Sequence, residues 1–181
     1  MSDQRSPLAR LLRPRSLAVV GASPEPLSVG NNVLENLRRF AFAGELHFVS
    51  RSRTEIDGTP CVPTIDDLPM GVDALILIVP AQAVLESIEA CGRRGVGGVV
   101  VFASGFSEQD EAGAAAQAAF AKAARDANVV VLGPNCIGSV NYADGVPLTF
   151  EPVEPHPTKG PGVCVIAQSG AMQGNVRYAL M

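Results

Sequence analysis

The sequence has no tryptophan, only two tyrosines and two histidines, and four cysteines that form no C-x-x-C pair. Scattered cysteines exclude the usual zinc-site pattern and a disulfide framework, and they are typical of proteins from a reducing compartment. The two histidines stand apart from any other group that could form a triad or an acid–base pair with them. We therefore expect no catalytic residue and no metal site.

Excess charge and long apolar runs are lacking as well. The formal net charge of −4 over 181 residues argues against a nucleic-acid coat or a polybasic membrane anchor. No apolar stretch approaches the roughly 20 residues that a membrane helix needs. The N-terminal stretch LARLLRPRSLA is interrupted by arginines and a proline, unlike a signal peptide. The expected location is the cytoplasm.

What the chain does have is an alternation of short apolar runs and longer amphipathic ones. The apolar runs are almost continuous in Val, Ile and Leu, as in parallel strands covered on both faces. The predicted strands are 17–20, 46–49, 74–79, 98–103 and 129–132, and the predicted helices are 29–40, 83–93 and 111–127. This alternation predicts an α/β fold with a Rossmann-like, doubly wound, mostly parallel five-stranded sheet in the order 3-2-1-4-5.

A change of composition after Leu148 predicts the end of this domain. The segment TFEPVEPHPTKGPG is rich in proline and glycine and is typical of a linker. The following GVCVIAQSGAMQGNVRYALM has the pattern of a strand, a small-residue turn and a helix start. We predict a Rossmann-like domain over residues 1–150, a linker over 151–161 and the first strand–helix unit of a truncated second domain over 162–181.

The connection after the first strand is the first candidate ligand loop. In a doubly wound sheet, ligands bind outside the carboxyl ends of the strands, here the loops 21–30 and 103–106. Gly21 lets a phosphate approach the backbone, and the helix after Gly30 offers free N–H groups. Ser23 and Ser28 can add hydroxyl donors. The two glycines lie nine residues apart, whereas the dinucleotide fingerprint has three glycines in six residues.

The end of the second strand carries Arg51 and Arg53, where an NAD-binding domain has Asp or Glu. Two guanidinium groups suit a phosphorylated ribose, which they can bind through charge-assisted hydrogen bonds. NADP, with its 2′-phosphate, and coenzyme A, with its 3′-phosphate, both fit this pattern. Val79 and Pro80 close the third strand at the same edge, and Cys136 is interpreted as a small buried residue.

The motifs taken in order resemble one family over nearly the whole chain. They are RPRSLAVVGAS, EIDGTPCVPTIDDLP, VDALILIVPA, GVVVFASGFSE, VVLGPNCIGSVN and GPGVCVIAQSGAM. This order is similar to the N-terminal part of the NDP-forming acyl-CoA synthetases, which include ADP-forming acetyl-CoA synthetase and are related to the succinyl-CoA synthetase alpha subunit. The resemblance implies a CoA-binding domain of an acid–thiol ligase, with coenzyme A as the cofactor.

The resemblance also implies where CoA contacts fall: on the loop after the first strand, on a basic residue after the second and on the start of the loop after the fourth. Together with the strand-end argument, the predicted CoA-binding residues are Gly21, Ala22, Ser23, Ser28, Gly30, Arg51, Arg53, Val79, Pro80, Phe102, Ala103 and Ser104. Relatives often read Val-Asn-Pro-Lys after the second strand, whereas this chain reads VSRS.

In the family, a phosphorylated histidine and an ATP-grasp region complete the reaction, and neither has a counterpart in this sequence. We therefore expect the chain to be inactive alone and to work with the remaining ligase domains, in cis or as a separate subunit.

One alternative is a freestanding regulatory module that senses CoA or another nucleotide. Another is an NADP-dependent oxidoreductase, which is disfavoured because no Tyr-Lys pair is evident. For the apolar run 163–167 we expect packing against the first domain, pairing with another copy or disorder. Pairing, which would give a homodimer, is preferred.

Overall fold

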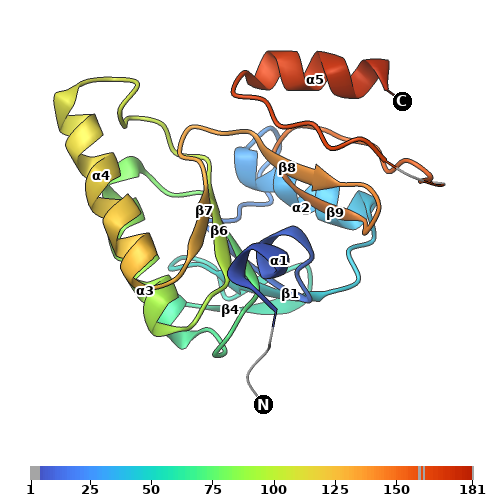
Figure 1. Ribbon diagram of the computed structural model, residues 1–181. Coiled ribbons are helices and arrows are strands. Elements are labelled where there is room, and N and C mark those ends of the chain that lie inside the picture. Colours follow the sequence, from blue (N-terminus) through green and yellow to red (C-terminus); the bar gives the residue numbers. More distant parts are fainter. Residues whose placement is uncertain (1–4, 159, 161, 181) are drawn as a thin grey trace.

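The computed structural model describes residues 5–158, 160 and 162–180 (Figure 1). Its helices are α1 (Pro7–Leu12), α2 (Val29–Arg39), α3 (Val84–Arg93), α4 (Glu111–Asp126) and α5 (Gly170–Ala179), with 3₁₀ turns at Ile65–Asp67 and Ala81–Ala83. Its strands are β1 (Ser16–Val20), β2 (Glu45–Val49), β3 (Glu55–Ile56), β4 (Thr59–Val62), β5 (Ala74–Leu77), β6 (Gly98–Val101), β7 (Val130–Leu132), β8 (Gly138–Asn141) and β9 (Val146–Thr149).

Seven of these strands form one sheet in the order β3-β4-β2-β1-β5-β6-β7, and β8 and β9 form a separate antiparallel hairpin. All pairs from β4 to β7 are parallel, whereas the short β3 runs antiparallel to β4. The predicted Rossmann-like α/β fold is confirmed. If β3 is set aside, the six parallel strands follow the doubly wound order 3-2-1-4-5-6.

The predicted count of five strands and the predicted place of 74–79 are wrong. That order put residues 74–79 at the sheet edge beside β2, but β5 pairs with β1, with Ala74 opposite Leu17. The place beside β2 belongs to β4, where Cys61 lies opposite Phe48. β4 has only four residues and contains Pro60, which breaks the apolar pattern that marks a strand.

The sheet is covered on both faces, as Figure 1 shows: α1, α2 and the β8–β9 hairpin lie on one side, and α3 and α4 on the other. The residues of β1 alternate between the two cores. Ala18 and Val20 pack in the core that includes α3 and α4, and Leu17 and Val19 pack in the core that includes α2. This double cover explains why the central strands read as continuous apolar runs.

The first residues after β9 pack against the domain. Val153 is buried, and Arg177 of α5 pairs with Glu151, with 3.4 Å between Nη1 and Oε2. The strand expected over 163–167 is not formed, and Val163 and Ile166 are 76% and 94% exposed. The run is apolar enough for a strand, but no sheet edge of the described chain pairs with it. Among the described residues, no helix is both long and apolar enough to cross a membrane.

Candidate functional site

The centre of the candidate site is the point where β1 and β5 lie side by side. β1 continues into α2 on one face of the sheet, and β5 continues into α3 on the other. Their connections therefore diverge, which opens a crevice at the carboxyl ends of the strands. The sequence placed loop 103–106 beside loop 21–30. In the structure loop 78–81 takes that position, and loop 102–106 lies one strand further out.

Gly21 permits the close approach of the two central loops. It has a φ of +79°, and its N–H donates to the carbonyl of Val49 at 3.1 Å. A Cβ at this position would collide with the backbone carbonyl oxygen of Ile78. From the sequence, we interpreted Gly21 as a residue that lets a ligand phosphate approach the backbone. The structure shows that the backbone itself already requires glycine here.

Ser28 and Gly30 shape the beginning of α2. The Ser28 hydroxyl caps the helix by accepting from Asn31 N at 3.0 Å, and it donates its proton to the Ser23 carbonyl at 3.1 Å. A Cβ on Gly30 would overlap the backbone nitrogen of Ser23. Ala22 is buried. Within the described part of the chain, the Ser23 hydroxyl accepts from Glu25 N at 3.3 Å and donates to no other group, so its proton is available for another acceptor.

The turn after β2 brings an arginine to the same loop. The Ser50 hydroxyl accepts from the backbone N–H of Arg53 at 3.2 Å and so closes the turn. The Arg51 side chain is exposed. Arg53 reaches the loop after β1, where its Nη2 lies 3.2 Å from Oε1 of Glu25. The structure thus brings two of the predicted segments into direct contact.

The remaining predicted residues follow β5 and β6. Val79 is half-buried, and Pro80 and Ser104 are exposed. The ring of Phe102 packs edge-on against Phe150, with 4.9 Å between centroids. Phe102 therefore supports the core on the α2 side. The carbonyl of Ala103 accepts from Asn135 N at 2.9 Å, which fixes the β6 loop to the β7 loop.

Two acidic residues at this edge were missed by the sequence analysis. One is Glu25, described above. The other is Glu108, whose Oε1 accepts from the backbone N–H groups of Gly105 at 2.6 Å and Phe106 at 3.2 Å. Hydrogen bonds from its own backbone amide and from these two amides hold the pKa of Glu108 below its usual value. A glycine followed three residues later by an acid was the available signal.

Cys136 is half-buried, so it is less enclosed than the sequence interpretation of a buried residue expected. Burial raises its pKa, and its Sγ lies 3.4 Å from the carbonyl oxygen of Val101. A raised pKa favours a structural role over that of a nucleophile, because the nucleophilic form of cysteine is the thiolate. In the described part of the chain, no three His, Cys, Asp or Glu side chains are placed to hold a metal ion.

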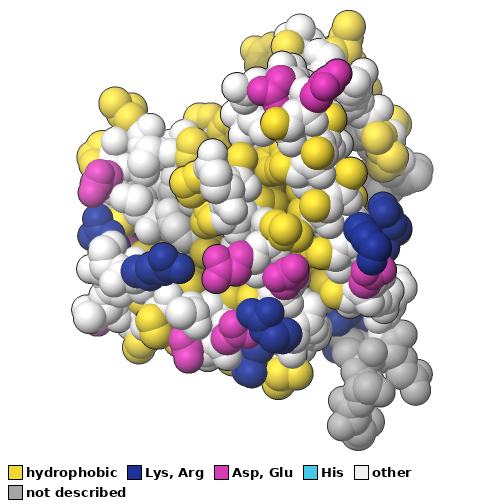
Figure 2. All heavy atoms as spheres, turned by 90° about the vertical axis from the view of Figure 1, so that its left-hand side faces the viewer, with side chains coloured by type: hydrophobic (Ala, Val, Ile, Leu, Met, Phe, Trp, Pro, Cys, Tyr) yellow, Lys and Arg dark blue, Asp and Glu magenta, His cyan; other side chains and the backbone are white. Residues whose placement is uncertain are grey.

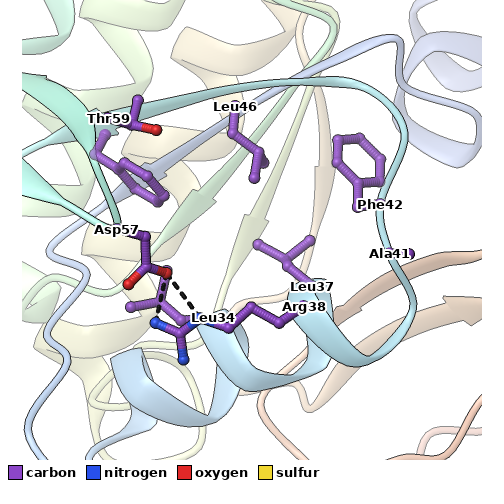
Figure 3. Close-up of a pocket in the computed structure, with 9 residues that line it drawn as sticks. Leu34, Leu37, Arg38, Ala41, Phe42, Leu46, Asp57 and Thr59 are labelled. Carbon is purple, nitrogen blue, oxygen red and sulfur yellow. Dashed lines mark hydrogen bonds and ion pairs between the residues drawn. The ribbon is translucent and has the colours of Figure 1, made fainter.

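A separate cavity of about 250 Å³ lies between α2 and the beginning of β2, away from the carboxyl edge (Figure 3). Its lining is mostly apolar, with Leu37, Phe42 and Leu46 turned toward the hollow. Among the described residues that line it, Arg38 and Asp57 alone are charged, and they bind each other with 2.8 Å between Nε and Oδ2. Because these charges are already paired, the cavity offers no free charged group to orient a ligand.

The surface on the α4 side carries no concentration of one charge. Figure 2 shows hydrophobic side chains there between separate acidic and basic groups. Many exposed positions of α4 are alanine, and Lys122 and Asp126 form an i, i+4 pair at 2.6 Å. This face therefore lacks the positive stripe of a nucleic-acid surface.

Comparison with known proteins gives relatives that act on CoA. Residues 15–142 match the CoA binding domain family. A trans-feruloyl-CoA synthase from an unknown prokaryote is 38% identical over 173 residues, covering 94% of this chain and 24% of the relative. ADP-forming acetate–CoA ligase I of Archaeoglobus fulgidus is 37% identical, with 91% and 23% covered. The alpha subunit of ADP-forming acetate–CoA ligase II of Pyrococcus furiosus is 32% identical, with 91% and 35% covered.

Solved structures agree with these matches. The structure of PH0766 from Pyrococcus horikoshii superposes with a TM-score of 0.83 at 30% identity, covering 95% of this chain and 38% of that one. An acetyl-coenzyme A synthetase of Candidatus Korarchaeum cryptofilum, in complex with phosphate and ADP, gives 0.79 at 31% identity, with 96% and 36% covered. The chain spans about a quarter to a third of the length of these relatives. It belongs to the CoA-binding domain family of the NDP-forming acyl-CoA synthetases.

Proposed function

We propose that this chain binds coenzyme A or an acyl-CoA in the crevice at the carboxyl ends of β1, β2, β5 and β6. One observation carries the proposal. The end of β2, where an NAD-binding domain has a carboxylate, carries an exposed Arg51 and an Arg53 that reaches Glu25 in the loop after β1. Family membership supports CoA as the ligand, and the two guanidinium groups suit its 3′-phosphate.

The other loops receive the remaining parts of the ligand in this proposal. The diphosphate lies near the first turn of α2, where backbone N–H groups and the helix dipole favour an anion. Ser23 donates its hydroxyl proton there. The pantetheine arm runs past Pro80 and Ser104, which lie exposed at the ends of neighbouring strands.

Catalysis is proposed to need more than this chain. We infer that it serves an NDP-forming acyl-CoA synthetase as its CoA-binding part, in the cytoplasm, with ligase and ATP-grasp domains in cis or on a separate subunit. The relative from Pyrococcus furiosus, named as an alpha subunit, supports the second arrangement. The exposed side chains of Val163 and Ile166 are proposed contacts for a second copy of the chain.

Isothermal titration calorimetry with CoA, acetyl-CoA, NADP and NAD tests the proposal. CoA and acetyl-CoA should bind saturably at one site, and NAD should not bind, because no carboxylate ends β2. Tighter binding of NADP than of CoA would favour the oxidoreductase alternative. Binding of none of the four ligands would contradict the proposed function.

A further inference from the structure

Glu25 occupies the middle of the loop after β1 and places its carboxylate on Arg53. The backbone around Glu25 is held on both sides: its N–H donates to the Ser23 hydroxyl at 3.3 Å, and its carbonyl accepts from Ser28 N at 3.2 Å. The side chains of Glu25 and Arg53 are 75% and 35% exposed. A braced loop therefore presents one carboxylate to one guanidinium at the mouth of the crevice.

A carboxylate and a phosphate bind a guanidinium through the same N–H groups. Glu25 at 3.2 Å from Nη2 therefore occupies a donor that a ribose phosphate would use. Exposed ion pairs of this kind are weak, at about 0.2–1 kcal/mol. A phosphate monoester carries nearly two negative charges at neutral pH, so it can displace a single carboxylate. Breaking the Glu25–Arg53 ion pair would then reduce the free energy gained when the phosphate binds.

We propose that Glu25 is a specificity-determining residue that competes with the ribose phosphate of the ligand for Arg53. This inference rests on the proposed binding of CoA. A ligand that carries the 3′-phosphate displaces Glu25, whereas dephospho-CoA leaves the Glu25–Arg53 pair intact. Glu25 thus lowers the affinity for CoA and leaves the affinity for dephospho-CoA unchanged. The difference in affinity between CoA and dephospho-CoA is therefore smaller than it would be without Glu25.

The test compares the dissociation constants of CoA and dephospho-CoA for the full chain and for Glu25→Gln, measured by calorimetry. The variant keeps the size and main-chain contacts of residue 25 and removes the charge. It should bind CoA about two- to fivefold more tightly, the range that an exposed ion pair allows, with dephospho-CoA unchanged. In the Arg53→Ala background, the same substitution should no longer change the ratio of the two constants.

Glu154→Gln is the matched control. Glu154 pairs with Arg39 at the same N–O distance of 3.2 Å, and the exposures of the two side chains, 76% and 32%, are close to those of the Glu25 pair. Arg39 ends α2, at the opposite end of the helix from the crevice. This control changes the net charge equally and should leave both constants unaltered.

The outcomes separate this inference from the proposed function. CoA binding by Glu25→Gln that is unchanged or weaker, while the unaltered chain binds CoA, contradicts the competition and leaves the proposed function standing. An equal gain for CoA and dephospho-CoA, or an equal gain in Glu154→Gln, shows a general charge effect and also contradicts it. Absence of CoA binding by the unaltered chain contradicts both.

Discussion

The side chain of Asn36, buried in α2, accepts a hydrogen bond from the backbone N–H of Val153 at 3.2 Å. Its amide nitrogen donates to the carbonyls of Thr149 at 2.9 Å and Glu151 at 2.7 Å. One side chain therefore satisfies three main-chain groups, one in the last residue of β9 and two in the segment that follows it. This segment is fixed to α2 although its composition is that of a linker.

Replacing Asn36 with alanine should destabilise the protein by about 2–4 kcal/mol, because two buried hydrogen bonds and one part-buried hydrogen bond to the main chain are lost. The free energy of unfolding, measured by chemical denaturation, checks this expectation. Asn175→Ala, at an exposed position of α5, is the control and should change it by less than about 0.5 kcal/mol. A loss below about 1 kcal/mol for Asn36→Ala would show that water replaces these bonds.

Asp73 connects the N-terminal helix to the sheet, at the edge opposite the crevice. Its carboxylate is nearly buried and accepts from Arg5 Nη2 at 2.6 Å, Arg10 Nε at 2.9 Å and Arg15 N at 2.7 Å. Burial alone would raise the pKa of Asp73. The hydrogen bonds from Arg15, Arg5 and Arg10 outweigh this effect and hold the pKa below its usual value.

A lowered pKa in the folded state means that Asp73 stabilises the protein above its unfolded pKa of about 3.9 and loses this effect as the pH falls through the folded pKa. Asp73→Asn should therefore lower the free energy of unfolding at pH 7 by about 3–5 kcal/mol, since it removes the buried negative charge that the Arg5 and Arg10 guanidinium groups face. The loss of stability between pH 5 and pH 2 should be shallower in the variant. Equal pH slopes would contradict this role.

Asp126→Asn provides a comparison for Asp73. Asp126 pairs with Lys122 on the surface of α4, where both side chains are more than half exposed. An exposed i, i+4 pair contributes about 0.3–0.5 kcal/mol. The substitution should therefore leave the free energy of unfolding almost unchanged at pH 7.

Gly21→Ala should cost about 2–5 kcal/mol of stability, because it combines a left-handed backbone with a collision against the Ile78 carbonyl. Gly58→Ala separates the two effects. Gly58 has a φ of +76°, and nothing lies within 4 Å of its added Cβ, so its cost should be about 1 kcal/mol. Denaturation midpoints of the two variants check the difference, and equal losses would refute the collision.

The arrangement of the sheet was only partly predictable from the sequence. The buried parallel strands β1, β5 and β6 are continuous apolar runs, and the sequence pattern identified them. It missed β9, which is also buried but is interrupted by Pro147. The place of β5 beside β1 depends on β4 taking the position next to β2. The pairing of β4 with β2 could not be expected, because β4 is short and contains Pro60 and so lacks the apolar pattern of a typical strand. Strand order is a property of tertiary pairing, which local periodicity does not record.

The candidate site shows a similar division. The rule for doubly wound sheets directed attention to the carboxyl edge of the sheet, but the wrong strand order put loop 103–106 in the place that loop 78–81 takes. It could not predict that Ser28 uses its proton inside the loop, or that Gly21 avoids a carbonyl. The contact between Glu25 and Arg53 joins side chains 28 positions apart and follows from the fold of two loops. Such contacts have no signature in a single sequence.

Changing Arg51 and Arg53 together to alanine should weaken CoA binding by about 1–3 kcal/mol, the scale of charged hydrogen bonds. Dephospho-CoA should lose less, because it lacks the 3′-phosphate that the arginines are proposed to bind. Calorimetry with both ligands checks the difference. Equal losses of affinity for CoA and dephospho-CoA would contradict the proposal that the 3′-phosphate binds at the end of β2.

The central claim, that CoA binds at the carboxyl edge of the sheet, is tested most directly by titrating the ¹⁵N-labelled chain with CoA and following the backbone amide signals. We predict saturable shifts in the loops 21–30, 50–53, 78–81 and 102–106, with little change around Asp73 and Gly97 at the opposite edge. Shifts centred on that opposite edge or on the cavity beside Leu37, or no saturable shift at all, would contradict the account.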